Sequence, residues 1–273
     1  MVEVLVHFVV PALVGVLIGI ASGLLGIGGG TVMVPIFRLA FGMSATMSTA
    51  TSLFAIIPTS ISGAISHVKG KTCIPALGIA AGLGGACLSP VGVWLAQLSP
   101  DWLVMLAAAL IIGYSAINMF KKAFKVPRAG QPAEGADAAA PTADDSSLSR
   151  KQLLQGAAIG LVAGLASGYV GVGGGFIMVP LMLSIIGIPM RKASGTSLIA
   201  VMILAIPGVI EQGIIGNINY LAGIAIVIGT IPGAVIGARL VAKVPERTLR
   251  LLFGCFLIVA AVMLVLNEVG IFG

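Results

Sequence analysis

The sequence predicts an all-α, polytopic membrane protein built from two inverted repeats of about five transmembrane segments each. Three observations support this prediction: an apolar composition, a self-similarity at a fixed offset and a one-sided distribution of basic residues. Of the 273 residues, 58% are hydrophobic and 9% are charged, and the mean hydropathy is +1.14. Soluble domains carry about 25% charged residues, so most of this protein's surface must face lipid.

The chain matches itself when residue 22 is laid over residue 167, an offset of 145 residues. Residues 22–35 then lie over residues 167–180, and nine of the fourteen positions are identical. The same offset pairs Thr51-Ser52-Leu53 with Thr196-Ser197-Leu198 without a gap. Such self-similarity is the signature of an internal repeat.

Each repeat divides into five apolar segments, and the second segment of each repeat is short. Twelve residues of helix reach about 18 Å, which is less than the hydrocarbon core of about 30 Å. We therefore expect a glycine-rich break before each short segment to lie inside the bilayer. The expected segments are 4–25, 31–42, 46–66, 74–98 and 102–120 in the first repeat, and 153–170, 176–187, 194–215, 218–242 and 249–266 in the second.

Three regions follow from this division. Residues 1–120 form the first transmembrane repeat and residues 152–273 the second. Residues 121–151 are rich in Ala, Pro, Gly, Asp and Ser, and we expect them to form a disordered linker.

The basic residues indicate how the chain crosses the membrane. If the linker is cytoplasmic and the short segments cross, fourteen of the fifteen Lys and Arg residues lie inside, and only Arg38 does not. If the short segments dip and return instead, only eight lie inside. Five crossings per repeat give the halves opposite orientations, a recurring transporter design. We therefore expect a secondary transporter that alternates access as one repeat rocks against the other. We expect a multi-pass protein of the plasma (inner) membrane, with the linker in the cytoplasm and both termini outside.

The repeated motif G-x-G-G-G-x-x-x-x-P runs from Gly26 to Pro35 and from Gly171 to Pro180. A glycine-rich stretch that opens a helix presents unpaired N–H groups at a positive dipole end, which suits an anion without any cationic side chain. The alternative interpretation is that these glycines form tight turns and packing seams. The predicted substrate-binding residues are Gly28, Gly29, Gly30, Thr31, Thr51, Ser52, Gly173, Gly174, Gly175, Thr196 and Ser197.

The two motifs, with the Thr51-Ser52 pair and the run from Gly195 to Ser197, resemble the sulfite exporter TauE/SafE family. The resemblance covers nearly the whole chain outside the linker. It implies a permease, and by family an exporter, for small sulfur-containing anions such as sulfite or organosulfonates. A passive anion channel and a carrier of small carboxylates are the alternatives.

Three further polar residues have candidate roles. Arg38 is a basic residue inside an apolar segment, where it either attracts the anion or extends to the interface. His67 and Glu211 are candidates for a coupling proton, although both lie near expected helix ends, where a solvated residue is the plainer interpretation.

Other function classes fit the sequence poorly. A dinucleotide fingerprint would need a third glycine where Thr31 and Phe176 stand, and no GK[ST] motif is present. The three cysteines have no metal-ligand spacing, so we expect neither a metal nor another cofactor. We also expect no enzymatic activity and no nucleic-acid partner. The expected partners are a small anionic substrate and the lipid bilayer, and a homo-oligomer is a further hypothesis.

Overall fold

The computed structural model describes residues 10–124 and 149–268, which are helical apart from short connections. Seven of the described helices are long and apolar enough to cross a membrane, and three apolar helices are shorter. The prediction of an all-α, polytopic membrane protein is therefore confirmed. The elements are α2 (Val10–Leu25), α3 (Gly30–Phe41), α4 (Ala45–Lys69), α5 (Pro75–Leu98), α6 (Asp101–Phe124), α7 (Arg150–Val170), α8 (Gly175–Leu181), the π-helix η3 (Met182–Ile186), α9 (Met190–Ile215), α10 (Tyr220–Leu240) and α11 (Glu246–Glu268).

Most helices extend beyond the apolar segments that predict them. α11 begins at Glu246 rather than at residue 249, and α9 begins at Met190 rather than at residue 194. The extra turns are polar because they lie at the ends of the bundle, where hydropathy no longer marks a helix. For the same reason α6 continues to Phe124 and α7 begins at Arg150, so helix enters the predicted linker at both ends. Residues 125–148 of that linker lie outside the described residues.

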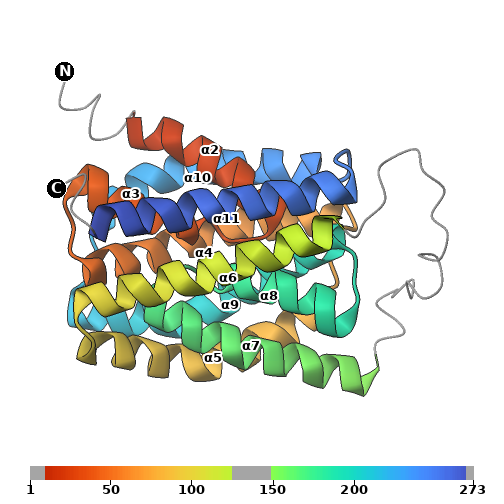
Figure 1. Cartoon of the computed structure of the whole chain (residues 1–273), viewed down its shortest axis with the longest axis horizontal. Coiled ribbons are helices and arrows are strands. Elements are labelled where there is room, and N and C mark those ends of the chain that lie inside the picture. Colours follow the sequence, from red (N-terminus) through yellow and green to blue (C-terminus); the bar gives the residue numbers. More distant parts are fainter. Residues whose placement is uncertain (1–9, 125–148, 269–273) are drawn as a thin grey trace.

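The long helices run roughly parallel to one axis, and matched helices run in opposite directions (Figure 1). α6 runs from left to right in that view, and its counterpart α11 runs from right to left. α3 lies at the left end of the bundle, near the start of α2, whereas α8 lies further to the right. Each short helix thus returns toward the end from which the first helix of its own repeat starts.

Two glycine-lined seams hold the bundle together. In the seam between α2 and α10, a Cβ added to Gly229 would lie 1.8 Å from the Ala12 carbonyl oxygen. In the seam between α7 and α5, a Cβ added to Gly84 would lie 2.3 Å from the Ala157 carbonyl oxygen. The two contacts join matched positions of the two repeats, because residues 12 and 84 correspond to residues 157 and 229 at the offset of 145. Backbones can approach this closely only where no side chain intervenes, which is how membrane helices pack without a hydrophobic driving force.

The seams interleave the two repeats. α5 belongs to the first repeat but packs against α7 and α9 of the second, and α10 packs against α2 and α4 of the first. The matched helices α4 and α9 also contact each other, as do α6 and α11. The halves of the sequence therefore do not form separate bodies.

The close packing of α2 against α10 predicts how adding a single methyl group at this seam changes the stability of the protein. Replacing Gly229 with Ala should lower the thermal unfolding temperature in detergent, because the added Cβ overlaps the Ala12 carbonyl and forces α2 and α10 apart. Overpacking of this kind costs about 1–3 kcal/mol, which exceeds the gain of about 1 kcal/mol in helix propensity. Gly113→Ala in α6 is the matched control, since nothing lies within 4 Å of its added Cβ. Equal unfolding temperatures for the two variants would contradict the seam.

Candidate functional site

Two glycine turns separate α2 from α3 and α7 from α8. In the first turn the φ angles are 75° at Gly26, 81° at Gly28 and 84° at Gly29. In the second they are 73°, 88° and 68° at the matched glycines 171, 173 and 174. Residues with a side chain rarely adopt this left-handed region, so the pattern G-x-G-G is required by backbone geometry. Both turns are buried.

The two turns meet in the middle of the bundle. A Cβ added to Gly28 would lie 3.0 Å from Val201 Cγ1 and 3.3 Å from Ile56 Cγ2, and one added to Gly173 would meet the same two side chains. Ile56 lies near the middle of α4, and Val201 is its counterpart in α9. α3 and α8 therefore begin inside the bundle, and their positive dipole ends face its centre.

The turns also touch each other. A Cβ added to Gly30 would lie 2.5 Å from the Val172 carbonyl oxygen, and one added to Gly175 would lie 2.4 Å from the Gly26 carbonyl oxygen. The backbones of the two repeats are in direct contact here. The structure therefore brings together the predicted site glycines of both repeats, from Gly28 to Gly30 and from Gly173 to Gly175.

Buried hydroxyl groups lie beside the first turn. A Cβ added to Gly28 would be 3.5 Å from Ser60 Oγ, and one added to Gly29 would be 3.6 Å from Ser22 Cβ. The Ser22 and Ser60 hydroxyls have no hydrogen-bond partner among the described residues, and the same is true of the predicted site residues Thr31 and Ser52. Neither Ser22 nor Ser60 is among the site residues predicted from the sequence. Ser22 opens the self-matching stretch, but Ser60 is matched by Ala205, so the repeat gives no signal for it.

The two turns differ in their hydrogen bonds. The Ser197 hydroxyl lies 2.7 Å from the Gly26 carbonyl oxygen and 2.8 Å from that of Ser194, so Ser197 contacts the first turn. In the second turn the Gly175 N–H donates to the Gly173 carbonyl at 2.8 Å. The next glycine carbonyl behaves alike in both turns: that of Gly29 accepts from Val32 and Met33, and that of Gly174 accepts from Ile177 and Met178. The Gly175 N–H thus has an acceptor within its own turn, whereas the matched Gly30 N–H makes no such bond within the described residues.

Thr51 and Thr196 cap helices of the opposite repeat. The Thr196 hydroxyl accepts from the Ile74 N–H at 2.9 Å and donates to the Lys192 carbonyl at 2.6 Å. The Thr51 hydroxyl accepts from the Asn219 N–H at 3.0 Å, which is the matched contact. Ile74 and Asn219 are the N-cap residues of α5 and α10. The structure therefore places both threonines at helix starts rather than beside the glycine turns.

His67 bonds residues outside both glycine turns, and Arg38 lies at the opposite end of α3 from the first turn. The buried His67 ring bonds through Nε2 to the Gly23 carbonyl and through Nδ1 to the Thr72 hydroxyl, both at 2.7 Å. Since a carbonyl only accepts, Nε2 carries a proton. The Thr72 hydroxyl, which also lies 3.3 Å from the His67 carbonyl oxygen, can either donate to Nδ1 or accept from it. Arg38 lies half-buried in the last turn of α3, the helix at the left end of the bundle in Figure 1, opposite the end at which α6 finishes.

Glu211 lies near the C-terminal end of α9 and is half-buried. Its Oε2 is buried without a hydrogen-bond partner among the described residues. The neighbouring Gln212 accepts from the Asn217 side chain at 2.8 Å, which matches the bond between His67 and Thr72 in the first repeat.

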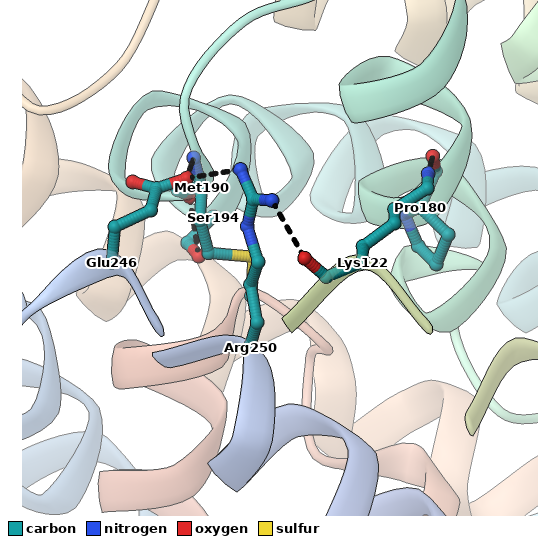
Figure 2. A network of polar contacts seen from close by, with 6 residues as sticks. All are labelled: Lys122, Pro180, Met190, Ser194, Glu246 and Arg250. Carbon is teal, nitrogen blue, oxygen red and sulfur yellow. Dashed lines mark hydrogen bonds and ion pairs between the residues drawn. The ribbon is translucent and has the colours of Figure 1, made fainter. Parts of the chain in front are cut away.

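A polar network fixes the second short helix (Figure 2). The Lys122 ammonium donates to the Pro180 carbonyl at 2.7 Å and also bonds the Ser184 hydroxyl. Arg250 donates to the Lys122 carbonyl at 3.3 Å and to Glu246 at 2.8 Å. These contacts tie the end of α6 to α8 and η3 on one side and to α11 on the other.

Glu246 also caps α9, since its Oε1 accepts from the Met190 N–H at 2.7 Å. Asp101 occupies the matched position and accepts from the Ala45 N–H at 3.1 Å, where α4 begins. Neither acid is among the residues predicted from the sequence. The signal was present, because each follows a matched proline, Pro100 or Pro245, at the same offset.

Fold and site define an all-helical, polytopic membrane protein with two half-length helices that begin at buried glycine turns. A family model described as sulfite exporter TauE/SafE matches residues 11–264, and the chain belongs to this family. The resemblance predicted from the glycine motifs is therefore confirmed.

The relatives are membrane transporters by name. The chain is 27% identical over 281 residues to the probable membrane transporter protein YunE of Bacillus subtilis, covering 97% of this chain and 99% of that one. It is 29% identical over 275 residues to a probable membrane transporter protein of Haemophilus influenzae, covering 93% and 97%. It is 27% identical over 164 residues to the sulfite exporter TauE/SafE family protein 3 of Arabidopsis thaliana, covering 58% of this chain and 31% of that one. No solved structure matches the chain.

The caps at Thr51 and Thr196 predict a structural rather than a binding role. Thr196→Val should lower the unfolding temperature, because the buried Ile74 N–H loses its acceptor at a cost of about 1–3 kcal/mol. Thr196→Ser keeps the hydroxyl and should behave like the wild type. In a transport assay corrected for the amount of folded protein, Thr196→Val should leave the KM for the anion unchanged. A raised KM of Thr196→Val together with an unchanged unfolding temperature would instead show that Thr196 binds the anion.

The matched pairs at His67 and Gln212 predict that His67 is structural. His67→Gln places in the first repeat the residue that the second repeat uses at the same position, where it bonds Asn217 without a titratable ring. We expect its transport rate to keep the pH dependence of the wild type. Loss of that dependence in His67→Gln, but not in Glu211→Gln, would assign the coupling proton to His67.

Proposed function

We propose that this chain is a secondary transporter that exports small sulfur-containing anions, such as sulfite or organosulfonates, across the plasma membrane. One observation carries the proposal: two buried glycine turns meet at mid-bundle, and each opens a short helix whose positive dipole end faces the same point. The family to which the chain belongs supports the substrate class. Small carboxylates are the alternative substrates.

The anion, in this proposal, binds closer to the first turn than to the second. The N–H groups from Gly28 to Thr31 supply donors there, and the buried hydroxyls of Ser22 and Ser60 lie beside them without a partner in the described part of the chain. Hydrogen bonds to a charged group are worth about 1.5–3 kcal/mol each, so two serines and a helix start are enough for a small oxyanion. Because the turns touch through Gly30 and Val172, they must separate to admit the anion.

The bodies that move, in this proposal, are not the halves of the sequence. α2 and α10 share one glycine seam and both contact α4, while α5 and α7 share the other seam and both contact α9. Sliding a seam would drive backbone into backbone, so each group of three helices moves as a unit. The contact between α4 and α9, where Ile56 and Val201 face the turns, is then the place where access alternates.

Tracer counterflow tests the function directly. Proteoliposomes are loaded with unlabelled sulfite, an organosulfonate, acetate or chloride, and uptake of labelled anion is followed. We expect saturable accumulation with a sulfur oxyanion and none with chloride. Accumulation with acetate alone would transfer the proposal to small carboxylates. Anion conductance without counterflow would assign the protein to passive channels.

The two serines give the sharper test of the site. Ser22→Ala and Ser60→Ala should each raise the KM for the transported anion by roughly tenfold or more, since each removes a bond to a charged group. Ser89→Ala is the matched control, because its hydroxyl is also buried without a described partner but lies near Gly208, in the seam region of α5. The same KM in all three variants would refute the site while leaving the transport function intact.

A further inference from the structure

Two grooves lie on either side of the C-terminal half of α4. This half of the helix is at the end of the bundle where α6 finishes and α7 begins, next to the basic residues that flank the linker (Figure 1). The first has a volume of 790 Å³ and lies between α4 and α10, and the second has a volume of 580 Å³ and lies between α4, α5 and α9. Both lie within the range of about 300–1,000 Å³ that is typical of ligand sites. Ile61, Ile65 and Lys69 line both grooves, so this stretch of α4 forms a ridge between them.

The grooves are apolar along their length and basic at one end. The second groove is lined by aliphatic side chains, with Lys69 as its one charged residue. The first groove is mainly aliphatic as well, and Lys69 and Arg239 stand at the end where α4 and α10 finish. Both cations are exposed, and neither forms an ion pair within residues 10–124 and 149–268.

The hydroxyls of the first groove already have partners. The Ser62 hydroxyl donates to the Ile231 carbonyl at 2.8 Å, and the Ser66 hydroxyl donates to the Ser62 carbonyl at 3.2 Å. The Thr72 hydroxyl bonds the His67 ring. The hydroxyls of the first groove are therefore already hydrogen-bonded, whereas the positive charges of Lys69 and Arg239 have no acidic partner within the described residues.

The depth of the grooves matches one leaflet of a bilayer. From Lys69 the lining reaches back along α4 to Pro58 in the first groove and to Ile57 in the second. Twelve residues of helix cover about 18 Å, and half of the hydrocarbon core is about 15 Å. A molecule with an anionic head at Lys69 would thus extend to the bilayer midplane along either groove.

We propose that this ridge binds an anionic phospholipid, with its phosphate between Lys69 and Arg239 and one acyl chain in each of the two grooves. Basic sites between membrane helices on the cytoplasmic side are known to take anionic headgroups. Two apolar grooves that meet at one cation fit a diacyl lipid better than a small soluble anion, which would leave both grooves unfilled. The lipid would bridge α10 and α4 on one side and α5 and α9 on the other.

The test uses delipidated full-length protein in detergent. Phosphatidylglycerol and phosphatidylcholine with identical acyl chains are titrated separately, and bound lipid is counted by native mass spectrometry alongside the unfolding temperature. We expect one phosphatidylglycerol to be retained and to raise the unfolding temperature, with phosphatidylcholine much weaker. Lys69→Gln with Arg239→Gln should weaken phosphatidylglycerol binding by roughly ten- to thirtyfold. Arg150→Gln with Lys151→Gln, two exposed cations of α7, is the matched control and should bind as the wild type does.

A groove variant and a soluble probe separate the outcomes. Ile65→Trp, which fills both grooves without changing charge, should weaken phosphatidylglycerol binding while leaving the lipid-free unfolding temperature unchanged. Equal binding of the two lipids, or full binding by the double charge variant, would overturn the proposal. If inorganic phosphate or sulfite displaced phosphatidylglycerol and Ile65→Trp had no effect, the cations would serve a soluble anion and the lipid site would be rejected. Retention of a second protein copy in place of lipid would reject it as well.

Discussion

Contact between glycine backbones is the constraint on which the rest of this structure depends. Membrane helices gain no hydrophobic energy by leaving lipid for one another, so they associate by close packing. Here the backbones of α2 and α10, and of α7 and α5, approach until an added Cβ on Gly229 or Gly160 would lie within 2 Å of a carbonyl oxygen. The same small residues allow the turns at Gly26 and Gly171 to reach the middle of the bundle. Without the seams, the first helix of each repeat could not hold its turn at that depth.

The seams also decide how the repeats combine. The fourth helix of each repeat packs against the first and third helices of the other repeat. The two repeats are therefore intertwined and do not form two adjacent bundles. The helix caps also cross between the repeats. The Thr51 hydroxyl accepts a hydrogen bond at the start of α10, and the Thr196 hydroxyl accepts one at the start of α5. A contact that crosses between repeats in one direction is matched by one in the other. The contacts between the repeats are therefore pseudo-twofold, and they centre on the place where Ile56 and Val201 face both glycine turns.

The halves diverge in their polar residues. Asp101 and Glu246 cap matched helices, but only Glu246 also pairs with an arginine and, through Arg250, joins a network that reaches Lys122 and Pro180. That network lies at the basic end, where the exposed Lys69 and Arg239 also stand. Ser22 and its counterpart Ser167 both have buried hydroxyls without a partner among the described residues, but Ser60, beside the first glycine turn, is matched by an alanine, and only the second turn has the bond from Gly175 to Gly173. A duplicated fold thus carries an asymmetric interior and one charged end.

The sequence by itself determined the class of the protein, its family, the two glycine breaks and the short helices that follow them. It could do so because hydropathy, helix length and the need for glycine at positive φ are local properties that a repeat displays twice. Only the tertiary structure decided which hydroxyls face the turns. Ser52 and Ser197 occupy matched positions, yet the Ser197 hydroxyl lies 2.7 Å from the Gly26 carbonyl oxygen and the Ser52 hydroxyl has no partner among the described residues, because that depends on which segment of the opposite half lies beside it. Ser60 came to the first turn in the same way, through the register at which α4 crosses Gly28, and no pattern along one chain records the register between two helices.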